Sequence, residues 1–310
     1  MDLSEIGKTI DGTSLAFLRL DCVGKGVDSI EILEQYPDLQ QIDLSRNKIG
    51  DVAPLALLPF VLKLSLVGNE IKNLEPWGEQ FLVHLMHLDV SENQLTKLPP
   101  LAMPALRTAR FAANLITTCS GFGGHAKLEQ LDLSKNKLLA VCGLANMPTL
   151  QRLNVAQNAI SGLGGLTGLA SLRELDVSLN QLEVLDGPWD GAANIEVLNA
   201  SSNKFGAAAE PTEEGGDPGP SPAAEDVVGG IRALAKLRTL RVEASPISEV
   251  GDIRLELLIV HPQLKDIDGT EVEDEEREKA AELHETRLEE QRQREEAERA
   301  KAAEAEEEEE

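Results

Sequence analysis

Apolar and polar positions follow one short pattern that recurs through most of this chain. In the segment LEQLDLSKNKL, residues 128–138, leucines occupy the first, fourth, sixth and last positions, and Asn136 lies between the last two of them. The same order begins at Leu39 and returns until residue 205, with its asparagines 21 to 24 residues apart. The asparagines are Asn47, Asn69, Asn93, Asn114, Asn136, Asn158, Asn180 and Asn203. A period of this length predicts stacked repeats, each of which is one structural unit.

The asparagine at a position surrounded by apolar residues has a structural explanation. Each repeat is expected to place a short strand before a turn that bends inward, which leaves backbone groups without strand partners. A buried backbone group without a partner costs about 1–3 kcal/mol, and an amide side chain carries both a donor and an acceptor. We therefore expect the asparagines to form a structural ladder along the stack and not a ligand site.

The pattern LxxLxLxxN, repeated about every 22 residues, resembles the leucine-rich repeat of intracellular proteins. The resemblance implies an α/β solenoid. This is a horseshoe with a parallel β-sheet on its concave face and short helical or irregular segments on its convex face. We expect this domain over residues 17–272, after a lead-in at 1–16. Weaker repeats lie at both ends, where Lys25 and Ser245 replace the asparagine, as expected for capping coils. Leu257, Leu258 and Val260 are expected to cover the last coil, before Leu264 and Ile267 resume the inward pattern.

Two acidic segments interrupt or follow the repeats. The net charge is −25, and residues 271–310 carry 19 acidic and 7 basic residues. Residues 207–229 are rich in Pro, Gly, Ala and acid, and we expect an insertion loop without a packed structure. The tail, 273–310, ends in poly-Glu, and its composition predicts a charged helix, supported by i to i+4 pairs such as Glu273–Arg277.

The tail helix has few apolar residues with which to pack. Leu283 and Leu288 are its large apolar residues, and with Arg287 they are the expected partner contacts. We expect this helix to pack only where a partner supplies the apolar surface. A merely solvated helix is the alternative.

Composition and charge exclude several function classes. No basic stripe predicts nucleic-acid binding, and no apolar run approaches the roughly 20 residues that cross a membrane. With no basic and apolar leader segment at the N-terminus, we expect an intracellular protein. Cys22, Cys119 and Cys142 are interpreted as small buried hydrophobes in a reducing compartment.

Catalysis finds no support in the sequence. The histidines lie on different repeats with no nucleophile arranged around them, and no metal-ligand spacing occurs. We expect a protein that is not an enzyme and has no cofactor, metal or small-molecule substrate. The histidines are His84, His87, His125, His261 and His284.

The candidate binding surface is a column on the concave face. The residue before the third apolar position of each repeat points out of the sheet, and these residues are polar and mostly acidic. They are Asp43, Ser65, Asp89, Arg110, Asp132, Asn154, Asp176, Asn199 and Arg241. The column two residues later is mostly Ser and Ala, which predicts a groove that fits a helix or an extended segment. A generic solvated face explains the same residues.

A second resemblance covers most of residues 17–295. The run IRALAKLRTLRVEASPISEV with the cap and acidic helix after it is similar to the end of ciliary leucine-rich-repeat proteins of the radial spoke, as are VDSIEILEQYPDLQQIDLSRNKI and the irregular MPALRTARFAANLITT with its Phe111. The resemblance implies a non-enzymatic scaffold subunit in the axoneme of motile cilia or flagella, whose partners are other radial spoke proteins. The insertion departs from this pattern. A phosphatase-regulating adaptor is the first alternative, and an acidic nuclear chaperone is the second.

Overall fold

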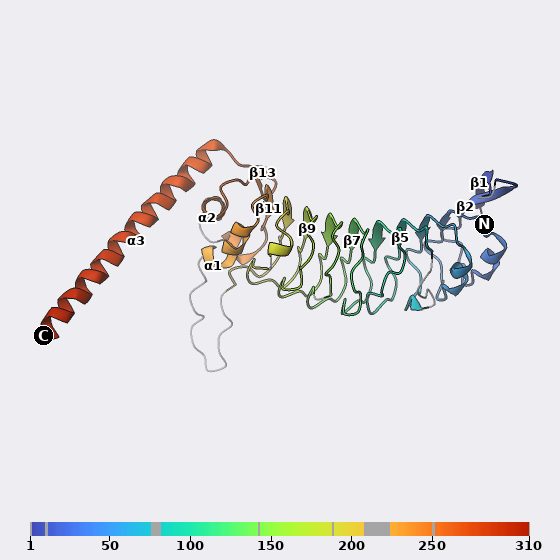
Figure 1. Cartoon of the computed structure of the whole chain (residues 1–310), viewed down its shortest axis with the longest axis horizontal. Helices are drawn as coiled ribbons and strands as arrows, with labels where there is room; N and C mark the ends of the chain where they lie inside the picture. Colours follow the sequence, from blue (N-terminus) through green and yellow to red (C-terminus); the bar gives the residue numbers. More distant parts are fainter. Residues whose placement is uncertain are drawn as a thin grey trace.

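The computed structural model describes residues 2–9, 12–75, 82–141, 143–187, 189–207, 224–249 and 252–309. Figure 1 shows an elongated array of stacked coils with a long helix leaving its C-terminal end. The strands stand in sequence order in one 13-stranded sheet. They are β1 (Asp2–Lys8), β2 (Leu15–Asp21), β3 (Gln41–Asp43), β4 (Lys63–Ser65), β5 (His87–Asp89), β6 (Thr108–Arg110), β7 (Gln130–Asp132), β8 (Arg152–Asn154), β9 (Glu174–Asp176), β10 (Val197–Asn199), β11 (Thr239–Arg241), β12 (Asp266–Ile267) and β13 (Thr270–Glu271).

The sheet is parallel from β2 to β12, because each coil carries the chain once around the stack before the next strand begins. The register places Leu131 opposite Leu153 and Leu153 opposite Leu175, so the inward leucines form columns. Each of the three is only 2% exposed, and full burial of such a side chain stabilises the fold by about 1.5–3 kcal/mol. The predicted fold class, a leucine-rich-repeat α/β solenoid, is confirmed.

The asparagines connect neighbouring coils through the backbone. Asn136 Oδ1 accepts a hydrogen bond from Ile116 N at 3.0 Å, and Asn136 Nδ2 donates to Phe111 O in the preceding coil and to Leu133 O in its own coil, both at 2.9 Å. The other seven asparagines make the same contacts one coil apart. Each amide therefore satisfies donors and acceptors that the inward turn takes out of the sheet.

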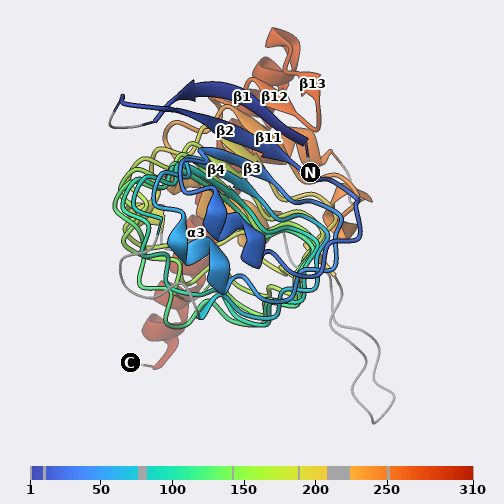
Figure 2. The same cartoon turned by 90° about the vertical axis from the view of Figure 1, so that its right-hand side faces the viewer.

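The convex side of the stack carries short helical turns and irregular segments. Figure 2, which looks along the array from its N-terminal end, shows the strands on one side of the coils and these turns on the other. The 3₁₀ segments are η1 (Glu31–Gln35), η2 (Ala53–Leu57), η4 (Trp189–Gly191), η5 (Gly229–Ala233) and η6 (Pro246–Glu249). Trp189 is buried within its convex loop, and the side chains of Cys22 and Cys119 are buried as predicted. Cys142 lies outside the described residues.

The insertion re-enters the stack earlier than the sequence indicated. Helix α1 (Ala224–Val228) precedes η5, and its Val227 and Val228 are buried. The carbonyl oxygen of Val227 accepts a hydrogen bond from Leu185 N at 2.7 Å, which ties α1 to the coil before the insertion. Residues 224–229 are thus part of the packed domain, while 208–223 lie outside the described residues.

Both ends of the sheet are closed by antiparallel strands. β1 pairs with β2, so much of the predicted lead-in at 1–16 extends the sheet as a hairpin. At the other end, helix α2 (Ile253–Val260) buries Leu257, Leu258 and Val260 over the last coil, as the sequence indicated. β12 then pairs with β13, and helix α3 (Asp274–Glu309) follows.

Candidate protein-binding surface

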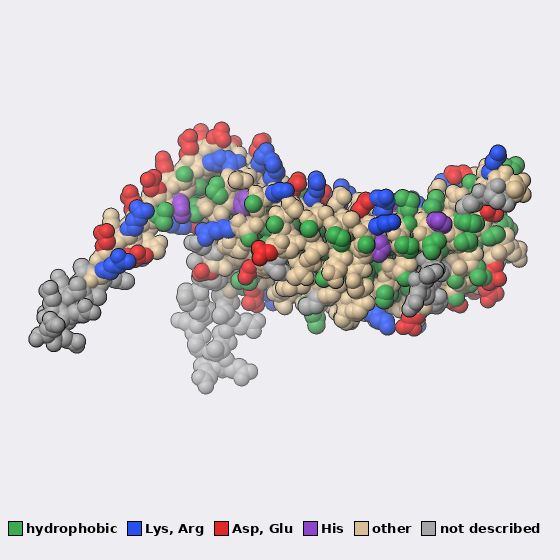
Figure 3. All heavy atoms as spheres, in the orientation of Figure 1, with side chains coloured by type: hydrophobic (Ala, Val, Ile, Leu, Met, Phe, Trp, Pro, Cys, Tyr) green, Lys and Arg blue, Asp and Glu red, His purple; other side chains and the backbone are tan. Residues whose placement is uncertain are grey.

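The predicted column of outward-facing residues lies along the concave face, at the third residue of each strand from β3 to β11. The register stacks these residues directly, for example Asp132 opposite Asn154 and Asn154 opposite Asp176. The strands lie along the upper edge of the molecule in Figure 1, and basic and acidic side chains both lie along that edge in the same view of Figure 3. The stack therefore brings the column together as one continuous surface.

The acidic members of this column hold the turn that follows each strand. Asp132 Oδ1 accepts a hydrogen bond from Ser134 N at 2.9 Å, and Asp176 Oδ1 accepts one from Ser178 N at 3.0 Å. Asp43 and Asp89 make the same contact two residues ahead, at 3.0 Å each. Asp and Asn side chains form such turns because their oxygen lies within reach of this backbone N–H. One oxygen of each carboxylate thus has a structural role.

Asparagine performs the same turn contact without the charge. Asn154 Oδ1 accepts a hydrogen bond from Ala156 N at 3.0 Å, and Asn199 Oδ1 accepts from Ser201 N at 3.3 Å and from Ser201 Oγ at 2.9 Å. The turn therefore requires an acceptor oxygen and does not require a negative charge. Folding therefore does not require the negative charges of this column.

Two arginines stand at the third strand position among these shorter side chains. Arg110 and Arg241 are exposed, whereas the Asp and Asn members are half-buried. An Nη1–Oδ2 distance of 3.7 Å joins Arg110 to Asp89 on the neighbouring strand. Asp176 Oδ2 accepts a hydrogen bond from Asn199 Nδ2 at 3.1 Å. The column is thus linked sideways by weak contacts that a partner can compete with.

The concave face is hollowed in two places. A hollow of about 400 Å³ lies over β6 to β11, and Arg110, Asp132, Asp176 and Arg241 line it. A second hollow of about 580 Å³ lies over β3 to β7, and its lining includes Asp43, Lys63, Ser65, His87 and Asp89. All nine residues of the predicted column line one hollow or the other. The concave face therefore offers a polar, shallow groove along the array.

The buried histidines have structural roles on the convex side. His125 Nε2 contacts Met103 O at 3.0 Å, and His125 Nδ1 accepts a hydrogen bond from Lys127 N at 3.2 Å. Burial lowers the pKa of His125, which keeps the ring neutral and able to accept that bond. His261 makes the equivalent Nε2 contact with Leu234 O at 2.9 Å in the closing cap. These rings connect coils and present no catalytic arrangement.

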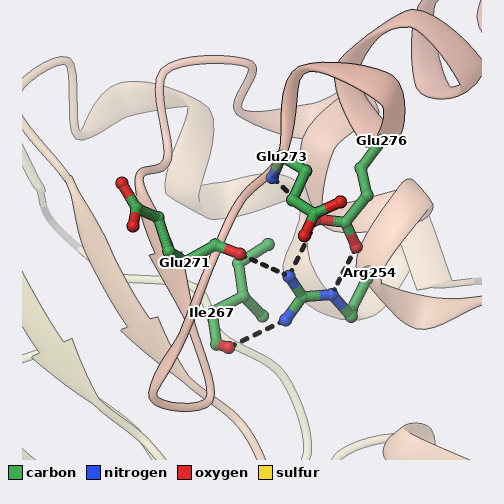
Figure 4. A network of polar contacts seen from close by, with 5 residues as sticks. All are labelled: Arg254, Ile267, Glu271, Glu273 and Glu276. Carbon is green, nitrogen blue, oxygen red and sulfur yellow. Dashed lines mark hydrogen bonds and ion pairs between the residues drawn. The ribbon is translucent and has the colours of Figure 1, made fainter.

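The first turns of α3 are held by the protein's own cap (Figure 4). Arg254 of α2 donates to Glu276 of α3 from Nε at 2.8 Å and from Nη2 at 3.0 Å, and its Nη1 donates to Ile267 O at 2.9 Å. Glu276 also accepts a hydrogen bond from Glu273 N at 3.1 Å, which caps the start of the helix. The bond from Arg254 lowers the pKa of Glu276 and raises that of Arg254, opposed by desolvation in each case.

The expectation that the tail packs only on a partner is corrected by these contacts. Ala280 is buried, Leu283 is half-buried, and Arg287 Nη1 donates to Glu256 Oε2 of α2 at 2.8 Å. Arg287 thus binds the cap of its own chain, and Leu288 is 40% exposed beyond the docked region. Arg277 donates to the carbonyl oxygens of Pro262 and Leu264 instead of pairing with Glu273. Docking between α2 and α3 was missed because it joins residues distant in sequence.

Within the described residues, no three His, Cys, Asp or Glu side chains gather to hold a metal ion. None of the described helices has an apolar stretch that could cross a membrane.

Comparison with known proteins agrees with the repeat pattern. Family models described as "Leucine rich repeat" and "Leucine Rich repeat" match residues 126–182 and 37–56. Leucine-rich repeat-containing protein 23 of Homo sapiens is 29% identical over 142 residues, which are 46% of this chain and 34% of that protein. The chain thus aligns with about a third of the length of this relative.

Solved structures show the same fold. The chain in the TLR13–ssRNA13 complex superposes with a TM-score of 0.62 at 21% identity, over 81% of this chain and 36% of that one. The leucine-rich-repeat chain of the octameric complex of Latrophilin 3, Unc5D and FLRT2 gives a TM-score of 0.52 at 20% identity, over 68% of this chain and 63% of that one. The fold is one typical of protein-interaction scaffolds.

Proposed function

We propose that this protein is a non-enzymatic scaffold subunit of the axonemal radial spoke in motile cilia or flagella, and that it binds a spoke neighbour in its concave groove. The observation that carries protein binding is the hollowed concave face, which is lined by all nine stacked column residues, six of them charged. A groove built on a rigid sheet holds its side chains in place before a partner arrives, which lowers the entropic cost of binding.

The comparisons support a binding role in general. The FLRT2 leucine-rich-repeat domain forms part of an octameric complex with other proteins. Fold alone does not assign a function, because one scaffold serves many partners. The assignment to the spoke therefore depends on the sequence runs that resemble ciliary spoke proteins, above all the last repeat, the cap and the charged helix over residues 231–295.

The docked helix adds a structural reason for a role in an assembly. α3 begins on the cap and extends well away from the array (Figure 1). Its 36 residues span roughly 54 Å at about 1.5 Å per residue. Because α2 holds the first turns of α3, the cap sets the direction in which the helix projects. The rest of the helix can then contact a second neighbour.

Localisation of a tagged full-length chain in ciliated cells tests this proposal. We expect a signal along the axoneme that survives membrane extraction and disappears in cells that lack radial spokes. A diffuse signal that is unchanged by loss of the spokes would reject the spoke assignment. Co-purification with a phosphatase catalytic subunit from the same cells would then favour the adaptor alternative.

A further inference from the structure

We propose that the hollow over β6 to β11 binds an α-helix of a partner protein that carries two basic side chains seven residues apart. Asp132 and Asp176 receive these side chains. The inference deepens the proposed function, because it states the chemistry of the partner that the concave face recognises. It rests on the charge pattern of the groove, on the spacing of the strands and on the roles of the turn residues.

Carboxylates occupy the column on every second strand. Asp43, Asp89, Asp132 and Asp176 lie on β3, β5, β7 and β9, while the strands between them carry Ser65, Arg110 and Asn154. Neighbouring strands are about 4.8 Å apart, so successive carboxylates are separated by roughly 9.6 Å along the array. Seven residues of an α-helix span about 10.5 Å and return close to the same face. A helix lying across the strands thus presents every seventh side chain to successive carboxylates.

The ends of this hollow carry the opposite charge. Arg110 lies one strand before Asp132, and Arg241 lies two strands after Asp176 in the sheet order. The charge order along the column is therefore basic, acidic, acidic, basic. Arg152 and Glu174, in the neighbouring column, contact each other at 3.1 Å and contribute no net charge. The complementary helix has an acidic residue about three positions before its first basic residue and another about seven positions after its second.

A helix suits this floor better than an extended segment. The backbone of the sheet is already paired between strands, and the column beside the acids consists of short side chains, among them Ser134, Ala156 and Ser178. An extended segment laid on this surface would cover its own N–H and C=O groups with few partners for them, which is costly. A helix satisfies its backbone groups internally. An extended segment would also cover the distance between Asp132 and Asp176 with about three residues, and residues three positions apart in a strand point to opposite faces.

The carboxylates keep acceptor capacity for such a partner. Asp132 Oδ1 accepts one hydrogen bond in its turn. Asp176 Oδ1 accepts two, from Ser178 N and Ser178 Oγ, and Asp176 Oδ2 accepts one from Asn199, which leaves one acceptor position free. A carboxylate accepts about four hydrogen bonds in total, so each group can bind a Lys or Arg without releasing its turn. Binding therefore needs no rearrangement of the sheet.

Designed peptides test the spacing directly. The probe is a labelled Ala-rich helix of about 20 residues, with two Lys seven residues apart and the two Glu residues placed as above. A second probe has the reversed sequence, because the hollow does not fix the chain direction. The control peptide has the same composition, with its second Lys moved two positions to the opposite face of the helix. Binding to the full chain is measured by fluorescence anisotropy.

Substitution with Asn separates recognition from folding. Asp132→Asn with Asp176→Asn keeps the turn contact that Asn154 and Asn199 already make, and it removes both charges. We expect the dissociation constant of the better probe to rise about tenfold in this variant, and the affinity to fall with added salt. Asp51→Asn is the matched control, because Asp51 Oδ1 accepts a hydrogen bond from Ala53 N at 2.9 Å, the same two-residue turn contact, and Asp51 lines neither concave hollow. It should leave binding unchanged.

Each outcome decides the proposal. Preference for the seven-residue probe over its control, lost in the double variant and kept in Asp51→Asn, supports it. Equal binding of the probe and control peptides, or no effect of the double variant, overturns it. If the tagged chain is retained on spokes while the probes do not discriminate, the partner chemistry is wrong and the proposed function stands. If the tagged chain is not retained on spokes while the probes do discriminate, the proposed function is wrong and the partner chemistry stands.

Discussion

The concave column and the tail helix are both charged, but contacts of different range hold their charged side chains. In the column, Asp132 is held by a backbone N–H only two residues away, and the equivalent contact recurs from coil to coil. In the tail, Glu276 is held by Arg254, 22 residues earlier, and Arg287 is held by Glu256, 31 residues earlier. Local turns thus fix the first set, whereas tertiary docking fixes the second. The groove is therefore built from local contacts that recur in several coils, whereas the attachment of the tail depends on a few contacts with the cap.

The largest expected effect separates the buried ladder from the surface column. Asn136→Ala removes the contacts with Ile116 N and Phe111 O and leaves buried backbone groups unpaired. We expect it to lower the free energy of unfolding by about 2–4 kcal/mol. Asn154→Ala, in the next coil, removes one half-buried turn contact and should cost about 1 kcal/mol or less. Urea denaturation followed by circular dichroism measures both, and equal costs would contradict the distinction.

Loss of the cap arginine should release the tail without unfolding the coils. Arg254→Ala removes the paired contact with Glu276 and the bond to Ile267 O. We expect docking of α3 to weaken by about 1–2 kcal/mol, since these hydrogen bonds are charge-assisted and partly exposed. Hydrogen exchange should accelerate over residues 274–288 and stay unchanged in β4 to β10.

Arg294→Gln is the control for this experiment, because Arg294 is exposed in the distal part of the same helix. Unchanged exchange of α3 in Arg254→Ala would mean that apolar packing of α2 against α3 at the buried Ala280 holds the helix without this arginine.

The chemistry of the column predicts a difference between two substitutions at one site. Asp132→Lys removes the acceptor for Ser134 N and should lower stability by about 1 kcal/mol, whereas Asp132→Asn keeps an acceptor and should change it by less than about 0.5 kcal/mol. Thermal denaturation of the two variants and of the unmodified chain gives the comparison. If Lys is tolerated as well as Asn, the turn contact contributes nothing to folding.

The smallest expected effect is an acid dependence confined to the tail. The pKa of Glu276 is held below its ordinary value by Arg254, so its contribution to docking is complete above the ordinary carboxyl range. That contribution is lost as the pH falls through the lowered pKa. Proteolytic cleavage within α3 should therefore rise at acid pH before the coils are cleaved. Glu276→Gln should weaken this pH dependence, while the Arg287–Glu256 contact keeps its own.

Much of the fold followed from the repeat pattern, and the reason is physical. A period of about 22 residues sets the length of a coil, so the apolar residues stack into one core and the asparagines meet the turns of the preceding coil. The candidate column followed for the same reason, since Asp43 and Asp176 occupy one register position several coils apart. The second role of these carboxylates, as acceptors for Ser45 N and Ser178 N, was not anticipated.

The sequence by itself therefore determined the features that repeat, which are the sheet, its core, the asparagine ladder and the concave column. The tertiary structure alone decided the ends, where no periodic neighbour exists. Strand β1 pairs with β2, so part of the lead-in forms a hairpin. Helix α1 lies where the end of the insertion loop was predicted, and α2 contacts the first turns of α3 through Arg254 and Glu256. These contacts join non-repeating residues far apart in the chain, so only the folded arrangement of the cap brings them within hydrogen-bond distance.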